Sequence, residues 1–458
     1  MLDPRNLELA NFLERKIGLP IRRFYATERD IHEALAQYHV SAPKAIEEML
    51  AESIHQISTS NQGDIDPPIA KVTSTIFQYA YQNRASDVHL EPRENDAIIR
   101  FRIDGVLHDI VKVPLTVHAQ IISHIKVRSG LRTDEHQTPQ DGKLRADTER
   151  EKIDVRVSVI PITHGEKVVL RLLSDRSRQF SLNNLGLKEE DLAKVEAAYH
   201  KPYGMVLVTG PTGCGKTTTL YSFLKLLNRR NVNIVTIEDP VEYDLEGVNQ
   251  IQVNPAAQLT FATGIRSILR QDPNVILVGE IRDVETARIA VNLAMTGHLV
   301  LSTLHTNNAA TAIPRLLDME IEPFLIASTV NVIIAQRLVR MIHMNCRVSE
   351  EIPREKLVEI VGEALTNQLL GAEEMTLRCY RGKGCEGCHG TGYQGRTGIF
   401  EVMEINNSLQ QAITHSATAD EITVLAQQSG MTTMQADGLS KVTEGITTLE
   451  EIVRVTKD

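Results

Sequence analysis

The chain of 458 residues contains no tryptophan, and aromatic residues make up only 4% of it. It also lacks a positive excess of charge, because 59 acidic residues outnumber 49 lysines and arginines and leave a net charge of −10. A surface that follows a nucleic-acid strand needs cationic side chains and often stacking rings. The composition therefore argues against nucleic acid as a partner.

Long apolar runs and an apolar N-terminus are also missing. The best candidate for a membrane span, residues 324–334, is short and is followed by Gln336 and Arg337. Charged residues occupy positions 3, 5 and 8, where a signal peptide would be apolar. We therefore expect a cytoplasmic protein that is not exported and has no membrane span of its own. Its five cysteines are expected to be thiols or metal ligands, not disulfides.

One motif stands out in what the sequence does contain. Residues 210–217 read Gly-Pro-Thr-Gly-Cys-Gly-Lys-Thr, a complete phosphate-binding loop of the pattern G-x-x-x-x-G-K-[ST]. Its backbone N–H groups can turn toward a phosphate chain at the start of a helix, Lys216 can reach the β- and γ-phosphates, and Thr217 can bind Mg²⁺. The sequence predicts a site for a nucleoside triphosphate, formed by Gly210, Pro211, Thr212, Gly213, Cys214, Gly215, Lys216, Thr217 and Thr218. Cys214 is expected to contribute only its backbone.

Four apolar runs, at 205–209, 233–237, 274–278 and 299–303, alternate with helix-like segments. This rhythm predicts an α/β core with a doubly wound, mostly parallel sheet that binds ligands at the carboxyl ends of its strands. A smaller α+β domain is predicted before it, with helices at 70–81 and 118–129 and strands at 97–103, 153–160 and 167–173. We expect a short helical segment and linker at 1–66, the α+β domain at 67–175, an interdomain linker at 176–190, the nucleotide-binding core at 191–340, a Cys-rich subdomain at 341–400 and a helical subdomain at 401–458.

Acidic residues and histidines flank the later strands of this core. Glu238 and Glu242 follow the second strand, Glu280 follows the third, and His298 and His305 bracket the fourth. Because the carboxyl ends of parallel strands share one edge, we expect these side chains to converge on the phosphates. One carboxylate would hold Mg²⁺, another would orient or deprotonate the attacking water, and a histidine would bond the γ-phosphate. The alternative for each acid alone is a solvated cap, and for His305 a structural hydrogen bond.

With these residues the sequence resembles the secretion ATPases of type II secretion systems and type IV pili, in particular the assembly branch. The resemblance extends from about residue 67 to the C-terminus. It rests on the segments Ala85–Pro92, Pro139–Gly142, Gly210–Thr218, Thr236–Tyr243, Leu269–Pro273, Gly279–Thr286, Thr296–Asn307 and Gly395–Glu401.

The resemblance implies a homohexamer of two-domain subunits, each with a RecA-like P-loop core preceded by a PAS-like α+β domain. ATP and Mg²⁺ would be bound between the two domains of a subunit. Hydrolysis would turn an inner-membrane platform protein and so drive pilin subunits out of the membrane. The ATPase itself would contact the membrane only through partner proteins. By position, Glu242 matches the catalytic glutamate and Glu280 the Walker B acid, which with Thr217 would hold Mg²⁺. His298 and His305 match the histidine box.

Further arginines are assigned to the site. In the family, arginines at the positions of Arg156 and Arg171 close over the γ-phosphate during hydrolysis. The alternative is that both pair with local carboxylates such as Asp154 or Glu166. Arg266 and Arg270, spaced i and i+4 on one predicted helix face, are expected to contact a neighbouring subunit or the nucleotide site. Glu238 and Arg396 are assigned to nucleotide binding.

A cysteine cluster follows the core. Cys385 and Cys388 form a C-x-x-C pair, and Cys346 lies 39 positions before it. The family usually carries a second C-x-x-C at the earlier place, where this chain has His343 in place of the first cysteine. Three cysteines and a histidine are a normal tetrahedral zinc set. His389 is an alternative fourth ligand, and thiols without metal are an alternative to the site as a whole.

Other functions compete with the assembly motor. A retraction motor of the same superfamily typically lacks the cysteine cluster, a RecA-like nucleic-acid translocase is disfavoured by composition, and a non-catalytic scaffold is disfavoured by the intact boxes. The N-terminal region resembles only the tail of the family's docking or cyclic-dinucleotide-binding modules, around residues 24–39. The sequence does not distinguish pilus assembly from type II secretion or DNA uptake.

Overall fold

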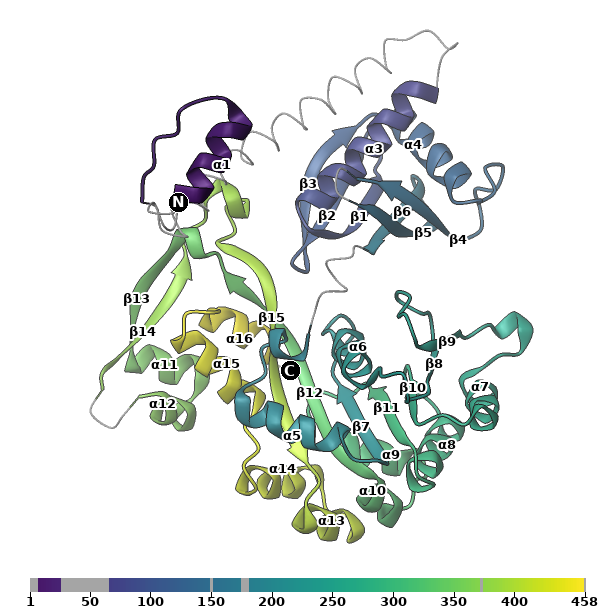
Figure 1. The fold of residues 1–458 in the computed structure, drawn as a ribbon, viewed down its shortest axis with the longest axis vertical. Coiled ribbons are helices and arrows are strands. Elements are labelled where there is room, and N and C mark those ends of the chain that lie inside the picture. The colour runs from purple at the N-terminus through teal and green to yellow at the C-terminus, as the bar shows by residue number, and fades with distance from the viewer. Residues whose placement is uncertain (1–6, 26–65, 149–150, 174–180, 371–373, 457–458) are drawn as a thin grey trace. The chain divides into compact units, whose positions relative to one another are not determined.

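The computed structural model describes residues 7–25, 66–148, 151–173, 181–370 and 374–456 (Figure 1). The chain divides into two compact units. One comprises Met1–Asp175, Ile342–Val348 and Gly382–Gln394, and the other comprises Arg176–Met341, Ser349–Arg381 and Gly395–Asp458. In the N-terminal region helix α1 spans Leu7–Ile17. The expected linker and most of the segment 24–39 lie outside the described residues.

Residues 66–173 form a six-stranded sheet in the order β3-β2-β1-β6-β5-β4. Every neighbouring pair is antiparallel. Helices α3 (Asp66–Gln82) and α4 (Leu115–Arg128) both pack on β1. Helix α3 also contacts β4, and α4 also contacts β6. The strands are β1 (Ala85–Pro92), β2 (Ala97–Ile103), β3 (Val106–Val113), β4 (Gln140–Asp147), β5 (Lys152–Ile162) and β6 (Gly165–Leu173). The helices and strands predicted here are present, with ends shifted by a few residues.

Alternation along these strands gives the sheet two unlike faces. Val88, Leu90, Val168 and Leu170 are almost fully buried in the core that includes residues of both helices. Every second residue between them points to the opposite face, because side chains alternate along a strand. That face carries most of the charged residues of the strands.

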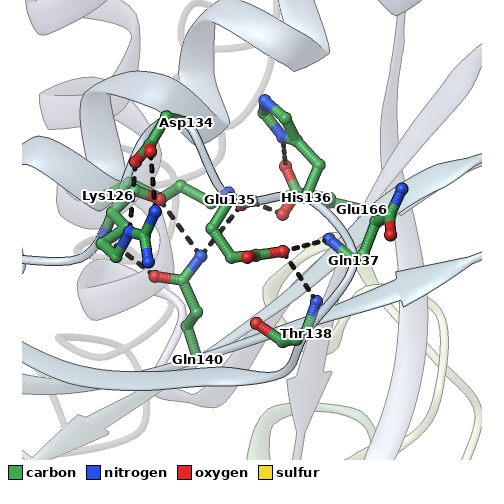
Figure 2. Close-up of polar contacts among 9 residues, drawn as sticks. Lys126, Asp134, Glu135, His136, Gln137, Thr138, Gln140 and Glu166 are labelled. Carbon is green, nitrogen blue, oxygen red and sulfur yellow. Dashed lines mark hydrogen bonds and ion pairs between the residues drawn. The ribbon is translucent and has the colours of Figure 1, made fainter.

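The loop between α4 and β4 is fixed by a buried lysine (Figure 2). The Lys126 side chain is 1% exposed, and its Nζ donates to Glu166 Oε1 and to the Glu135 carbonyl, both at 2.6 Å. The second oxygen of Glu166 lies 2.8 Å from His136 Nδ1. Gln140, the first residue of β4, closes the loop by accepting from the N–H of Arg132 at 2.9 Å and donating to its carbonyl at 3.1 Å. These contacts lead the chain into the box Pro139–Gly142.

The second unit is built on a seven-stranded sheet in the order β15-β12-β7-β11-β10-β8-β9. The pairs from β12 to β9 are parallel, which confirms the expected α/β class with a mostly parallel sheet. The strands are β7 (Gly204–Thr209), β8 (Ile234–Glu238), β9 (Asn249–Gln252), β10 (Val275–Val278), β11 (Leu299–Leu304), β12 (Val330–Ile342) and β15 (Tyr393–Glu404).

Helices cover both faces of this sheet. Residues of α5 (Glu189–Tyr199) and α6 (Lys216–Leu227) share a core with Val206 and Val208 of β7. Residues of four other helices share a second core with Met205 and Leu207 of the same strand. These helices are α7 (Phe261–Ile268), α8 (Val284–Met295), α9 (Ala312–Asp318) and α10 (Pro323–Thr329). Burial on both faces explains why the strands are continuous apolar runs.

The apolar run 324–334 is not a single element. It contains most of α10 and the start of β12, the strand beside β7. Within the described part of the chain, no helix has the length and apolar character needed to cross a membrane.

Smaller elements complete the chain. Strands β13 (Arg347–Pro353) and β14 (Thr376–Gly382) form a two-stranded sheet, and α11 (Arg354–Val361) and α12 (Glu363–Leu369) lie between them in sequence. After β15 the chain is helical, as expected. These helices are α13 (Asn407–Thr414), α14 (Ala419–Gln428), α15 (Met434–Thr443) and α16 (Leu449–Thr456).

Candidate active site and candidate metal centre

The loop 210–215 joins β7 to α6 at the carboxyl end of the strand. Gly210, Gly213 and Gly215 have φ angles of 145°, 80° and 91°, a region that favours glycine. Lys216 Nζ donates to the carbonyls of Gly210 at 2.8 Å and Pro211 at 3.1 Å. Burial lowers the pKa of Lys216, an effect that the nearby Glu280 carboxylate opposes. The loop thus has the backbone and the cation that bind a phosphate chain.

The side chain of Gln336 holds this loop from β12 and was missed by the sequence analysis as a site residue. Gln336 is 2% exposed, and its Nε2 donates to the Cys214 carbonyl at 2.7 Å. Its Oε1 accepts from Thr219 Oγ1 of α6, also at 2.7 Å. A Cβ at Gly210 would lie 2.5 Å from the Gln336 carbonyl, so the two segments approach closely. The sequence feature that could have indicated this role is a polar residue just after the apolar run 324–334.

Cys214 itself is buried in the loop. Burial raises the pKa of its thiol, which keeps it protonated at neutral pH. This agrees with a residue that contributes backbone only.

Glu280 and His305 come together at the same edge of the sheet. Glu280 follows β10, and its Oε2 lies 3.1 Å from His305 Nε2 and 2.7 Å from Arg282 Nε. Arg282 is a second residue that sequence reasoning missed. A Cβ at Gly279 would lie 3.2 Å from the Ile237 carbonyl, so a side chain at this position would be tight against the neighbouring strand.

Threonines fix the ends of the strands that carry these groups. Thr209 Oγ1 accepts from the N–H of Thr306 at 3.0 Å, which ties the residue after His305 to the strand before the loop. Thr303 Oγ1 donates to the Gly279 carbonyl at 2.8 Å, beside Glu280. The backbone next to His305 and next to Glu280 is therefore fixed by a threonine of an adjacent strand.

Glu238 has a different position from the nucleotide ligand that we expected. Its Oε2 accepts from the hydroxyl of Tyr221, and its Oε1 accepts from Thr236 Oγ1 at 2.5 Å and Gln250 Nε2 at 3.2 Å. Tyr221 in turn accepts from the N–H of Glu242 at 3.3 Å. Because both oxygens are used inside the protein, Glu238 orients the half-buried segment that carries Glu242. Burial and this carboxylate raise the pKa of Tyr221 well above its usual value.

His298 also differs from expectation. It precedes β11, whose parallel register pairs Leu299 with Gly204 and Leu304 with Thr209. His298 therefore lies at the amino end of the sheet, about 20 Å from the loop along a six-residue strand. Its Nδ1 faces the Leu293 carbonyl at 3.2 Å. The sequence placed both histidines beside the phosphates, and the strand direction separates His298 from them within one subunit.

The three remaining arginines that were predicted for the site, Arg266, Arg270 and Arg396, are exposed. Arg266 Nη2 lies 2.5 Å from Glu285 Oε1 of α8, and Arg270 Nη1 donates to the Arg266 carbonyl at 3.1 Å. Helix α7 ends at Ile268, so Arg270 belongs to the 3-10 turn after it. Arg396 lies in β15.

Arg156 and Arg171 lie directly opposite each other on β5 and β6. Arg171 Nε donates to Asp87 Oδ1 of β1 at 3.0 Å. The alternative of pairing with a local carboxylate therefore holds for Arg171, with Asp87 as its partner. Of the two carboxylates named for that alternative, Asp154 lies 2.9 Å from Arg145 and Glu166 lies 2.6 Å from Lys126.

The four predicted metal ligands lie together. The ligand atoms of His343, Cys346, Cys385 and Cys388 are all within 4.8 Å of one another. Cys388 Sγ is 3.7 Å from Cys385 Sγ and 3.9 Å from Cys346 Sγ, and His343 Nδ1 is 3.2 and 3.6 Å from the sulfurs of Cys385 and Cys346. A tetrahedron with metal–sulfur bonds of about 2.3 Å has sulfur–sulfur edges of about 3.8 Å, so a zinc ion fits. His389 is outside this group.

The surroundings of the cluster suit metal ligands. The N–H groups of Cys385 and Gly392 each donate to Cys388 Sγ at 3.2 Å, as expected of bonds that stabilise a thiolate. Burial lowers the pKa of His343, which favours the neutral imidazole that binds metals. The four side chains could therefore hold a metal ion.

The loop, the parallel sheet and the acid–histidine pair at its edge define a P-loop nucleotide-binding protein of the α/β class. Over residues 62–454 the chain matches the family described as "Type II/IV secretion system protein", and it belongs to that family. It is 41% identical to the type IV pilus assembly ATPase PilB of Myxococcus xanthus, over 99% of this chain and 81% of that one. It is 45% identical to the type II secretion system protein E of Dickeya dadantii, over 89% of this chain and 80% of that one.

Solved structures agree on the fold. The ATPase DotB of Legionella pneumophila has a TM-score of 0.61 at 20% identity, covering 87% of this chain and 97% of that one. The pilus retraction motor PilT, solved with bound ADP, has a TM-score of 0.57 at 25% identity, covering 84% of this chain and 97% of that one. The recognition of a type II secretion and type IV pilus assembly ATPase from the sequence is thereby confirmed.

Proposed function

We propose that this protein is a hexameric ATPase that powers the assembly of pilin or pseudopilin fibres through an inner-membrane platform protein, working at the cytoplasmic face of that membrane. The observation that carries the proposal is the Glu280–His305 pair at the sheet edge where the phosphate-binding loop lies. Relatives at 41–45% identity are named as pilus assembly ATPases or type II secretion proteins E, which supports the assembly direction.

In this proposal the core is RecA-like and the preceding domain PAS-like. The loop N–H groups and Lys216 bind the β- and γ-phosphates, and Glu242 orients and deprotonates the attacking water. Thr217 and Glu280 would hold Mg²⁺, which neutralises charge on the phosphates when bound. His305 bonds the γ-phosphate and, through Glu280, is sensitive to its loss. Arg156 and Arg171 of the N-terminal domain stabilise negative charge on the transferring phosphoryl oxygens.

The cysteine–histidine cluster is proposed to hold a structural zinc. Its three sulfurs and one imidazole are the ligands that zinc prefers, and all four positions of the tetrahedron are filled by protein. A closed set of this kind stabilises a fold and leaves no position for a reacting water.

Two rivals are less well supported. The first rival is a retraction motor such as PilT. This chain is 25% identical to PilT, compared with 41–45% to the relatives named for pilus assembly and type II secretion. A nucleic-acid translocase would require the ATPase to respond to DNA or RNA, and we expect turnover to be unchanged when either is added.

Three variants test the proposed catalysis. Lys216→Ala removes the cation at the β- and γ-phosphates and should abolish both ATP turnover and triphosphate affinity. Glu280→Gln and Glu242→Gln preserve the shape of the side chain, and they should bind ATP while losing hydrolysis. Phosphate release and binding of a fluorescent ATP analogue measure the two properties. Wild-type turnover in either Gln variant would remove that glutamate from the mechanism.

A further inference from the structure

A row of cations crosses the open face of the N-terminal sheet. The strand registers place Arg102 opposite Asp87, Asp87 opposite Arg171, Arg171 opposite Arg156, and Arg156 opposite Lys143. Four cations and one carboxylate thus share one line across five strands, which we call the cationic row. Like charges directly opposite each other destabilise a sheet, so the pairs Arg171–Arg156 and Arg156–Lys143 lower its stability.

Asp87 is the buried anchor of the cationic row. Its side chain is 7% exposed, whereas that of Arg171 is 59% exposed. Asp87 Oδ1 accepts from Arg171 Nε at 3.0 Å, and Oδ2 accepts from Ser86 Oγ at 2.9 Å and lies 3.5 Å from Arg102 Nε. The carboxylate is held on several sides, while the arginine above it reaches toward solvent.

This geometry fixes the direction of the guanidinium. An exposed arginine loses rotamer entropy when it binds a ligand. A bond from Nε to a fixed carboxylate restricts the side chain before any ligand arrives. The bond uses Nε, and the side chain of Arg171 remains 59% exposed, so solvent and ligands can reach it.

We infer that Asp87 is a positioning residue that orients Arg171 for catalysis. The inference rests on the proposed role of Arg171 at the γ-phosphate, and it gives a function to the box Ala85–Pro92, which the proposed mechanism otherwise leaves without one. Asp87 acts through Arg171 and does not itself touch the nucleotide. Its loss lowers the rate of hydrolysis because an arginine that stabilises transition-state charge must be in place when the charge develops.

The test is the steady-state kinetics of Asp87→Asn in the full chain. We expect kcat for ATP to fall roughly 10- to 100-fold with KM changed less than about threefold, because misplacement of a catalytic group by about 1 Å has costs of that order. Asp109→Asn is the matched control. Asp109 also bonds the Nε of a cross-strand arginine, Arg100 at 2.9 Å, but its side chain is 61% exposed and lies outside the cationic row. This control should keep wild-type kcat.

A cycle with Arg171→Ala separates positioning from general damage. In the Arg171→Ala background, Asp87→Asn should cause no further loss, since the group that it orients is gone. Asp87→Glu, which keeps the charge, should restore part of kcat. A multiplicative loss in the double variant, or a wild-type kcat in Asp87→Asn, overturns the inference.

A milder variant guards against failure to fold. Ser86→Ala removes the bond to Asp87 Oδ2 and keeps the carboxylate, so kcat should fall in the same direction by a smaller factor with the melting temperature little changed. An unchanged kcat in Ser86→Ala, if Asp87→Asn does not fold, also counts against the inference. If Arg171→Ala itself turns over ATP at the wild-type rate, it is the proposed role of the arginines that fails.

Discussion

At the scale of single residues, Gln336 shows how a side chain outside every motif can shape the site. It bonds the Cys214 carbonyl in the loop and the hydroxyl of Thr219 in α6, so one amide joins the loop to the helix that follows it. Both bonds are buried, and a buried polar group left without its partner costs about 1–3 kcal/mol. The loop therefore depends on β12 as well as on its own glycines.

Replacing Gln336 tests this dependence. Gln336→Ala should raise KM for ATP by roughly tenfold, because the loop N–H groups lose their fixed orientation. Asn331→Ala is the control on the same strand. Asn331 is also a buried amide and donates to the Tyr203 carbonyl at 3.0 Å, but it lies at the amino end of β7. Both variants should lower the melting temperature, and only Gln336→Ala should change KM; equal KM values would show that the amide is merely structural.

At the scale of elements, the loop between α4 and β4 depends on the buried ion pair of Lys126 and Glu166. Removing one partner leaves the other charge buried without compensation, which costs about 3–5 kcal/mol. Lys126→Met and Glu166→Gln should therefore each destabilise the N-terminal domain strongly, as measured by denaturant unfolding. The double variant should recover part of the loss. Additive losses would show that the two charges do not depend on each other.

The metal cluster is the second element whose chemistry can be tested. Zinc should copurify at about one ion per chain, and a chelator should release it when the protein is unfolded. His343→Ala should loosen the metal much more than His389→Ala, because only His343 has a nitrogen among the three sulfurs. Metal content by mass spectrometry and competition with a chromogenic chelator measure the difference. Metal-free protein of native stability would contradict the zinc assignment.

About half of the two large sheets could be predicted from the sequence, because buried parallel strands are continuous apolar runs and some antiparallel strands alternate. Strands β1, β3, β4 and β9 were not predicted. Strand β12 was missed because its apolar residues continue those of α10 without a break, and β15 because it begins among glycines. At the site, the glycine loop and the glutamates after strands were visible as motifs. The position of His298 required the strand direction, and the roles of Gln336 and Arg282 required the contacts between distant segments. Asp87 lies in the segment Ala85–Pro92 on which the family resemblance rests. Its contact with Arg171 could not be predicted, because the two residues are 84 positions apart in the sequence.

At the scale of the whole molecule, the chain has two compact units, and the apolar core of the N-terminal sheet is separate from the cores on the two faces of the parallel sheet. In the proposed mechanism Arg156 and Arg171 act on a phosphate bound by the P-loop of the other unit, and this would couple hydrolysis to domain motion. In a closed ring the motion of one subunit is transmitted to its neighbours, so the proposed hexamer should not behave as six independent enzymes.

Doping wild-type protein with Glu280→Gln subunits tests this coupling. The variant should bind ATP without hydrolysing it and so lock its own subunit. In a half-and-half mixture only about 2% of randomly assembled hexamers lack the variant, so turnover per wild-type subunit should fall steeply as the variant is added. Native mass spectrometry should show a species of about 306 kDa, six chains of 51.0 kDa, in each mixture. Turnover that falls in proportion to the fraction of variant would mean that the subunits hydrolyse ATP independently, and the proposed motor would lose its coupling between neighbours.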